Sequence, residues 1–179
     1  MSKAILFGLA ATLTACQQQS NSTEKLFFDI EGFTNGLVEE LNSSAPEVKK
    51  FSRINTEESE QTLKTINWSK ELELLRQSDL NKSAYSLSYK QEKTENSLVY
   101  TLNSDENLPI KELIIQFDSL GKPAQISSRH HTQNYLYGSE KDLSMNFSDG
   151  HLTSYDIKGW QELFVGGRKE FEVKGEIVN

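Results

Sequence analysis

The sequence predicts an α+β domain in which a first helix and a second, shorter helix pack on one face of a curved antiparallel β-meander. Two observations carry this prediction. Before about residue 80 the apolar residues recur at helical spacing, and after it they alternate with polar residues. Alternation is typical of strands with one buried and one solvated face, and short connections make neighbouring strands antiparallel.

Two helices are expected in the first part of the chain. The first covers about residues 23–41. Its apolar stripe consists of Phe27, Ile30, Phe33 or Leu37, and Leu41. Asn67 is a suitable N-cap for the second helix, which should end near Ser78. That helix would carry Trp68, Leu72 and Leu75 on one side.

The remaining segments are predicted to be strands. A hairpin of residues 48–54 and 61–66 precedes the second helix, and seven strands follow that helix. Those seven strands cover residues 85–89, 98–102, 113–117, 124–126, 135–147, 152–164 and 171–177. The strongest turn is expected at Asp149-Gly150, because this dipeptide accepts the positive φ angles of a two-residue hairpin turn.

Length and composition limit the class of protein. The chain has 179 residues, of which 36% are hydrophobic and 25% are charged, and this suits one globular domain. We expect residues 23–179 to form that domain, since no internal linker divides them. The formal net charge of -7 is opposite to the basic face that nucleic-acid binding requires, so no nucleic acid partner is expected.

The first sixteen residues carry the most specific motif in the chain. Residues 3–11 are one lysine followed by an apolar run, which is too short to cross a bilayer as a helix and is typical of a secretory signal. The motif Leu13-Thr14-Ala15-Cys16 follows, and a polar stretch begins directly after it. These four residues resemble the lipobox of bacterial lipoprotein precursors, which has a leucine three positions before the cysteine and small residues between them.

The resemblance implies a protein anchored to a membrane by lipid. Residues 1–15 would be a signal peptide, and the Cys16 thiol would carry a diacylglyceryl group as a thioether. Residues 16–22 would then form a lipidated tether, and two or more acyl chains hold a protein firmly on a bilayer. Because Gln17 is not acidic, we expect the periplasmic face of the outer membrane.

Catalytic and metal chemistry are not expected. Cys16 is the only cysteine, so no internal disulfide can form. His130 and His131 are adjacent on a predicted strand and should point to opposite faces, and His151 lies in no ligand pattern. The sequence has no Gly-x-Ser-x-Gly motif and no cofactor-binding pattern. We therefore expect no enzymatic activity, no metal and no cofactor.

Aromatic side chains on the predicted strands are the remaining candidates for a binding site. One interpretation places Tyr135, Tyr137 and Trp160 on a concave sheet face that binds an apolar or glycan ligand, since Tyr and Trp combine contact area with a hydrogen-bonding end. Tyr135 and Tyr137 are two positions apart and should share a face. The other interpretation is that these side chains are core residues and ordinary cross-strand pairs.

Two functions from different classes fit these features. The first is a non-enzymatic, lipid-anchored cell-envelope lipoprotein that binds an envelope protein or another envelope component through its sheet. The alternative is a periplasmic carrier or sensor of a hydrophobic ligand, held in a half-barrel cavity. A hydrolase has only the envelope location in its favour. In layout the chain is similar to small lipoproteins of Bacteroidota, but a layout assigns no binding residue.

Overall fold

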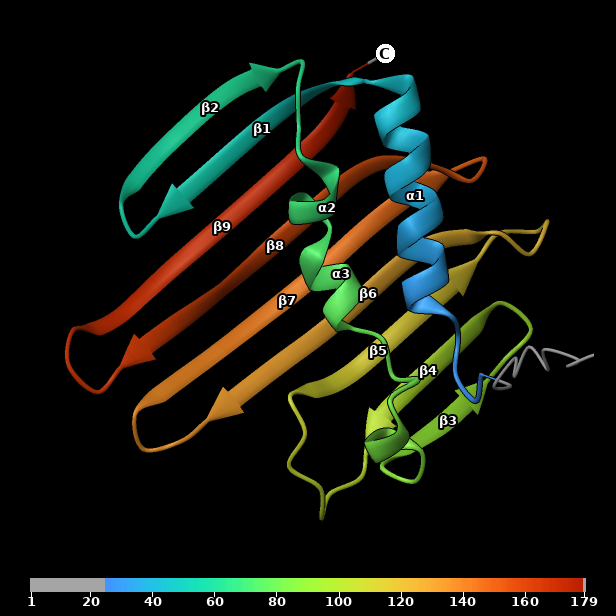
Figure 1. Cartoon of the computed structure of the whole chain (residues 1–179), viewed down its shortest axis with the longest axis vertical. Coiled ribbons are helices and arrows are strands. Elements are labelled where there is room, and N and C mark those ends of the chain that lie inside the picture. The colour runs from blue at the N-terminus through green and yellow to red at the C-terminus, as the bar shows by residue number, and fades with distance from the viewer. Residues whose placement is uncertain (1–24, 179) are drawn as a thin grey trace, which may run out of the picture.

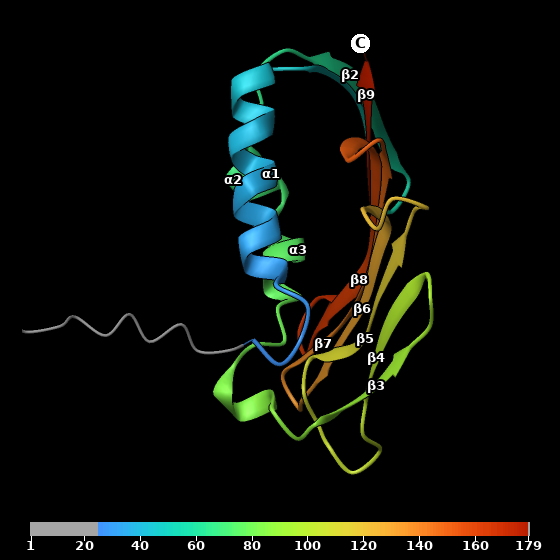
Figure 2. The same cartoon turned by 90° about the vertical axis from the view of Figure 1, so that its right-hand side faces the viewer.

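Among the described residues, nine strands form one open sheet and three α-helices lie on one of its faces (Figures 1 and 2). The computed structural model describes residues 25–178, and its architecture confirms the predicted α+β class. The helices are α1 (Ile30–Ser44), α2 (Trp68–Glu71) and α3 (Glu73–Gln77), and a short 3-10 helix covers Ser83–Tyr85. None of these helices is both long and apolar enough to cross a membrane.

All neighbouring strands are antiparallel, in the order β2-β1-β9-β8-β7-β6-β5-β4-β3. The strands are β1 (Glu47–Ile54), β2 (Glu57–Leu63), β3 (Tyr89–Lys93), β4 (Ser97–Leu102), β5 (Ile110–Phe117), β6 (Pro123–Gln133), β7 (Tyr137–Ser148), β8 (His151–Leu163) and β9 (Gly167–Val178). Strands β3 to β9 follow one another as the predicted meander. The β1–β2 hairpin joins the other edge of this meander, because β1 pairs with β9 and places Val48 opposite Ile177.

Helix α1 begins at Ile30, several residues later than the stripe of apolar residues predicts. The Asp29 carboxylate accepts a hydrogen bond from the backbone N–H of Gly32 at 2.7 Å, and this cap fixes the first turn. Phe27 lies before the helix, where its ring meets Tyr100 edge to face at 5.4 Å. The sequence pattern counted Phe27 as part of the helix because its partly buried ring packs against the same core.

The predicted second helix is present as two short pieces. The Asn67 side chain accepts a hydrogen bond from the N–H of Lys70 at 3.1 Å, which confirms its capping role. The helix is interrupted at Leu72, which ends α2 and precedes α3. Trp68 and Leu75 are nevertheless both buried against the sheet, as their spacing predicts.

The strand predictions differ from the structure mainly at their ends. Asn55 has a φ of 53° and closes a tight turn, so β2 starts at Glu57 and not at residue 61. Tyr85 belongs to the 3-10 helix, and Tyr135 lies in the turn before β7. The turn at Asp149-Gly150 is confirmed, with φ angles of 55° and 90°.

One hydrophobic core lies between the helices and the sheet. Its members come from α1, from the α2–α3 segment and from the sheet residues that face the helices. Fully buried members with the largest side chains are Tyr100, Ile30, Leu75, Leu80, Ile110, Leu113, Ile115, Ile126 and Met145. Every strand from β4 to β8 contributes to this cluster, so the sheet and the helices are stabilised by the same buried apolar surface.

A polar network closes this core near β1. The Lys50 ammonium contacts both carboxylate oxygens of Glu71 on α2, at 2.6 and 2.7 Å. The Tyr155 hydroxyl donates to the same carboxylate at 2.6 Å. The Tyr155 ring lies on Gly175 of the next strand, where an added Cβ would come within 2.2 Å of the ring. Burial and the Glu71 carboxylate both raise the pKa of Tyr155.

Candidate functional site

The sheet face opposite the helices is not covered by any element of residues 25–178 (Figure 2). We call it the open face. Side chains on a strand alternate between the two faces, so the register assigns each residue to one of them. On β5, for example, Ile115 is buried under the helices while Ile114 lies on the open face.

A row of alternating charges crosses the middle of the open face. The register places these residues directly opposite one another on successive strands from β5 to β2. In that order the row consists of Glu112, Arg129, Asp142, Lys158, Glu172, Arg53 and Glu58. Arg129 Nε lies 3.2 Å from Asp142 Oδ1, and Arg53 Nη2 lies 2.7 Å from Glu172 Oε2. Oppositely charged neighbours stabilise strand pairing, and the row carries both signs over seven strands.

A hollow of ≈ 440 Å³ lies over the centre of this row. Arg129 and Lys158 supply its positive charges, and Glu112, Asp142 and Asp156 supply its carboxylates. Burial raises the pKa of the Asp156 carboxyl, and the nearby Lys174 opposes this effect. The hollow is therefore polar and carries both positive and negative charges. Such a surface suits hydrogen-bonding and charged groups on a partner better than an apolar ligand.

Trp160 is the larger of two big aromatic side chains on the open face, and the other is Phe51 beside the Lys174 ammonium. The guanidinium of Arg168 lies over its ring at 4.3 Å from the centroid, and the His131 ring meets it at 6.3 Å. The ring packs over Gly138 of β7, where an added Cβ would lie 3.2 Å from Trp160 Cζ3. Glu140 separates His131 from Trp160 in the register. Trp160 is thus fixed in place on the open face, with its ring in contact with a charged side chain.

The structure does not bring the three predicted aromatic residues into one site. Trp160 pairs with Glu140 and lies on the open face, whereas Tyr137 pairs with Leu163 and has the helix-side orientation. Tyr135 is in the β6–β7 turn and is 84% exposed. Tyr135 and Tyr137 therefore do not form a strand face with Trp160, because the turn intervenes and β7 begins only at Tyr137. Cys16, the predicted lipidation site, lies outside the described residues.

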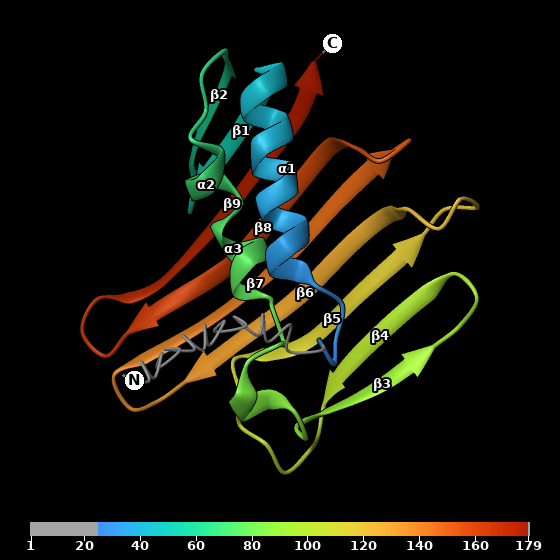
Figure 3. The same cartoon turned by 45° about the vertical axis from the view of Figure 1, so that its right-hand side comes forward.

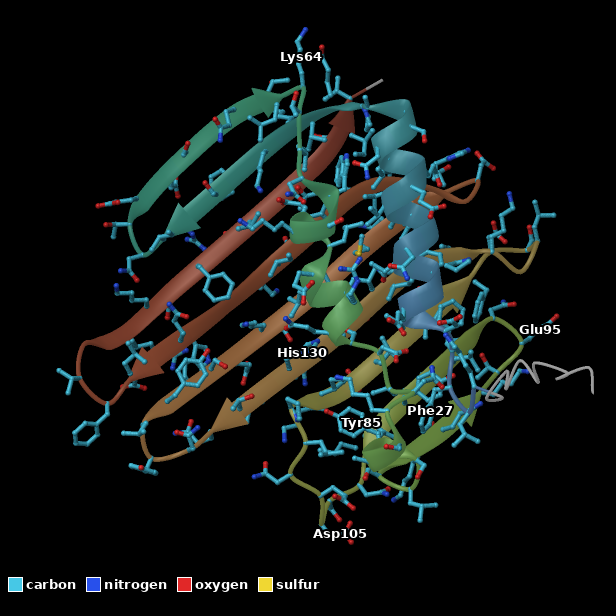
Figure 4. All side chains as sticks on the ribbon, viewed as in Figure 1. Phe27, Lys64, Tyr85, Glu95, Asp105 and His130 are labelled. Carbon is cyan, nitrogen blue, oxygen red and sulfur yellow. The ribbon has the colours of Figure 1, made fainter. Side chains whose placement is uncertain are left out.

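The histidines take the opposite orientations that their adjacency predicts. His130 lies beneath α3 (Figure 4), where its Nε2 is 2.9 Å from Ser78 Oγ and 3.1 Å from Ser128 Oγ. Burial lowers the pKa of His130 to about 4. His131 points to the open face, and the exposed His151 contacts Glu40. Within residues 25–178, no three His, Cys, Asp or Glu side chains gather as a metal site would require.

The charge row is the feature that sequence reasoning missed. Each member occupies an alternating polar position of its own strand, and that much is visible in the sequence. The row itself depends on the register between strands, which a single sequence does not specify. Comparison of the chain with protein-family models, curated proteins and solved structures gave no match.

Proposed function

We propose that this protein is a non-enzymatic, lipid-anchored cell-envelope lipoprotein that binds a partner protein through the open face of its sheet. The observation that carries the proposal is the open face itself, with its seven-strand charge row, its polar hollow and Trp160. A curved meander carrying the N-terminal helix and the second short helix on one side would hold this face rigidly toward its partner.

The chemistry of the open face suits reversible protein recognition. Interfaces that form and separate are about as polar as the rest of a protein surface, and their energetic centres are enriched in Trp and Arg. Trp160 with Arg168 provides such a centre. The charge row would give electrostatic complementarity, which sets specificity and association rate more than affinity. A partner should present the opposite order of charges.

The filled core favours partner binding over the rival function, a carrier or sensor of a hydrophobic ligand. Such a carrier needs an apolar cavity between helices and sheet. In this protein the side chains of α1, α2 and α3 pack onto the sheet residues in one cluster. The apolar side of the sheet is occupied by the protein's own residues, and the free side is polar.

The anchor is proposed from the lipobox at Leu13–Cys16. Lipidation of Cys16 would hold the domain on the periplasmic face of the outer membrane without a spanning helix. Intact mass of the purified mature protein tests this directly. We expect a chain that starts at Cys16 and carries diacylglycerol, and a mass equal to the unmodified polypeptide would contradict the anchor.

Site-directed crosslinking in cells tests the partner-binding face. A photo-reactive amino acid at Ser144, in the middle of the open face, should capture one protein of defined mass. The same group at Glu39, which is exposed on α1, is the matched control and should not capture it. Equal capture from both positions, or none from Ser144, would contradict the proposal.

Charge reversal then tests the charge row. The double variant Arg129→Glu/Lys158→Glu should lose capture from position 144 by at least about tenfold, because like charges would face the partner's acidic groups. The control variant Lys70→Glu/Lys82→Glu makes the same change in net charge on exposed residues away from the open face and should retain capture.

A further inference from the structure

Exposed apolar side chains gather at one end of the sheet. Among residues 25–178, ten large apolar residues are exposed. Seven of them lie at the end where β1, β4, β6 and β8 finish: Ile54, Leu87, Tyr135, Leu136, Leu163, Phe164 and Val165. The opposite end carries Leu120 and Val178. In Figure 4 the first end is marked by Asp105 and the opposite end by Glu95.

Five of the seven residues form what we call the hairpin-end cluster: Tyr135 and Leu136 in the β6–β7 connection, and Leu163, Phe164 and Val165 at the β8–β9 connection. These five side chains are between 53% and 84% exposed. The N–H of Phe164 donates to the carbonyl of Leu136 at 2.9 Å, so the two connections lie side by side (Figures 1 and 3). The cluster is therefore one surface built from two hairpins.

The backbone of the first connection is satisfied within the protein. The Asn134 side-chain oxygen accepts hydrogen bonds from the N–H groups of Leu136 and Tyr137, both at 2.9 Å. The Asn134 N–H donates to the Tyr137 carbonyl at 2.9 Å. Unpaired backbone groups are costly in a medium poor in water. This connection can enter such a medium with few polar groups left unpaired.

The composition of the hairpin-end cluster matches a membrane–water interface. Aromatic residues such as Tyr prefer the headgroup region, and Phe, Leu and Val contribute apolar area just below it. Lys169 follows Phe164 and Val165 along the chain, and a long cationic side chain beside apolar residues of this kind can reach lipid phosphates.

We propose that the hairpin-end cluster inserts shallowly into the bilayer to which the chain is anchored. The inference rests on the proposed lipidation of Cys16. The chain from Cys16 to Lys25, where the described structure starts, spans at most about 35 Å when extended. The domain therefore stays within one molecular diameter of the bilayer, and the cluster determines which end faces it.

A planar bilayer fits this surface better than a second copy of the chain does. The seven exposed residues are distributed from β1 to β3, along an end of the sheet roughly 34 Å wide, and do not gather around a pocket. A line of protruding side chains matches a plane. With this end on the membrane the strands would lead away from the bilayer, and the open face would be left free for a protein partner.

Fluorescence quenching by labelled lipids tests the proposal on the full, lipidated chain. Because Cys16 is the only native cysteine and would be acylated, Val165→Cys supplies a single free thiol for an environment-sensitive dye. Leu120→Cys, at the other end, is the matched control: Leu120 is 75% exposed and Val165 is 80% exposed. Both proteins are reconstituted in phosphatidylcholine vesicles that contain lipids with a headgroup-level nitroxide.

We expect the dye at position 165 to be quenched at least about threefold more strongly than the dye at position 120. Adding Leu136→Ser and Phe164→Ser should reduce the quenching at 165 to the level of the control. Both substituted side chains are exposed, so folding should be unaffected.

The outcomes separate this proposal from the anchor. Weak quenching at both positions, in protein that carries diacylglycerol by mass and floats with the vesicles, would overturn the inserted cluster and leave the anchor intact. A dye at 165 that is shielded from water but not quenched by the nitroxide would assign the cluster to protein contact and would also overturn it. Protein without acyl groups would overturn both.

Discussion

The two faces of the sheet are made by the same strands and have opposite properties. On β6, His130 is buried beneath α3 while the next residue, His131, lies beside Trp160 on the open face. On β5, Ile115 is fully buried and Ile114 is only partly covered. One face carries the core, and the other carries charges in register.

Because of this difference, the residues that stabilise the fold and the residues proposed to bind a partner lie on different faces of the sheet. The apolar surface that stabilises the fold is buried on the helix side, so residues of the open face can change with little effect on folding. Residues on the helix side are close-packed and shielded from water, so a substitution that changes volume or charge there should affect folding. The same substitution can therefore be made at two neighbouring residues, one on each face, and its effect on stability compared between the two faces.

The largest difference is expected between the two adjacent isoleucines of β5. Ile115→Ala should lower the free energy of unfolding by about 3–4 kcal/mol, because it leaves a cavity in the core. Ile114→Ala removes the same atoms from the open face and should cost about 1 kcal/mol or less. Urea denaturation of both variants measures the difference. Equal losses would mean that the open face is also covered.

The pH dependence of unfolding should distinguish the two histidines of β6. Burial lowers the pKa of His130 to about 4, and Lys82 and Lys141 act in the same direction, while Asp142 acts against them. The unfolded chain binds a proton near pH 6.5, where the folded chain does not. Stability should therefore fall by about 3 kcal/mol as the pH drops from 7 to 4.

Two glutamine variants isolate this contribution from the carboxylates that titrate in the same range. In His130→Gln, the free energy of unfolding should fall less between pH 6.5 and 4 than it does in the wild type, and the difference should be about 3 kcal/mol. His131→Gln, on the open face, should follow the wild-type curve. If His130→Gln retained the full fall, the buried histidine would not be its cause.

The elements of this fold were predictable where local chemistry determines them. Asn67 and the Asp149-Gly150 turn work through their own side chains or backbone, and both are confirmed. The predicted start of α1 was wrong, because the apolar stripe continues into the segment that includes Phe27, which packs against the core but is not helical. Periodicity reports which residues are buried and does not show whether the backbone is helical there.

The candidate site was less predictable because it depends on contacts between distant strands. Trp160 was identified as an aromatic residue on a strand, but its partners Arg168 and His131 come from β9 and β6. The pairing of β1 with β9 was also not predicted, and it brings Arg53 beside Glu172. Arg53 and Glu172 are 119 positions apart in the sequence, and the contacts of Trp160 depend on how three strands are aligned, so no local signal indicates either arrangement.

An ion pair on each face gives a smaller and sharper comparison. On the helix side, Lys50 and Glu71 keep only 21% and 15% of their side-chain surface exposed. Lys50→Met should lower stability by about 2 kcal/mol, because the Glu71 carboxylate would keep only the Tyr155 hydroxyl as a partner. Thermal unfolding measures the loss. Lys50→Met/Glu71→Met should recover part of it, and a still lower stability would contradict this account.

The smallest effect on stability is expected for the equivalent change on the open face. Arg129 and Asp142 are 56% and 37% exposed, so their 3.2 Å contact is screened by water and salt. Arg129→Met should change the free energy of unfolding by less than about 0.5 kcal/mol. The same variant should weaken capture of the partner from position 144, because it removes one charge from the middle of the row. A variant that lost stability but retained capture would reverse the roles assigned to the two faces.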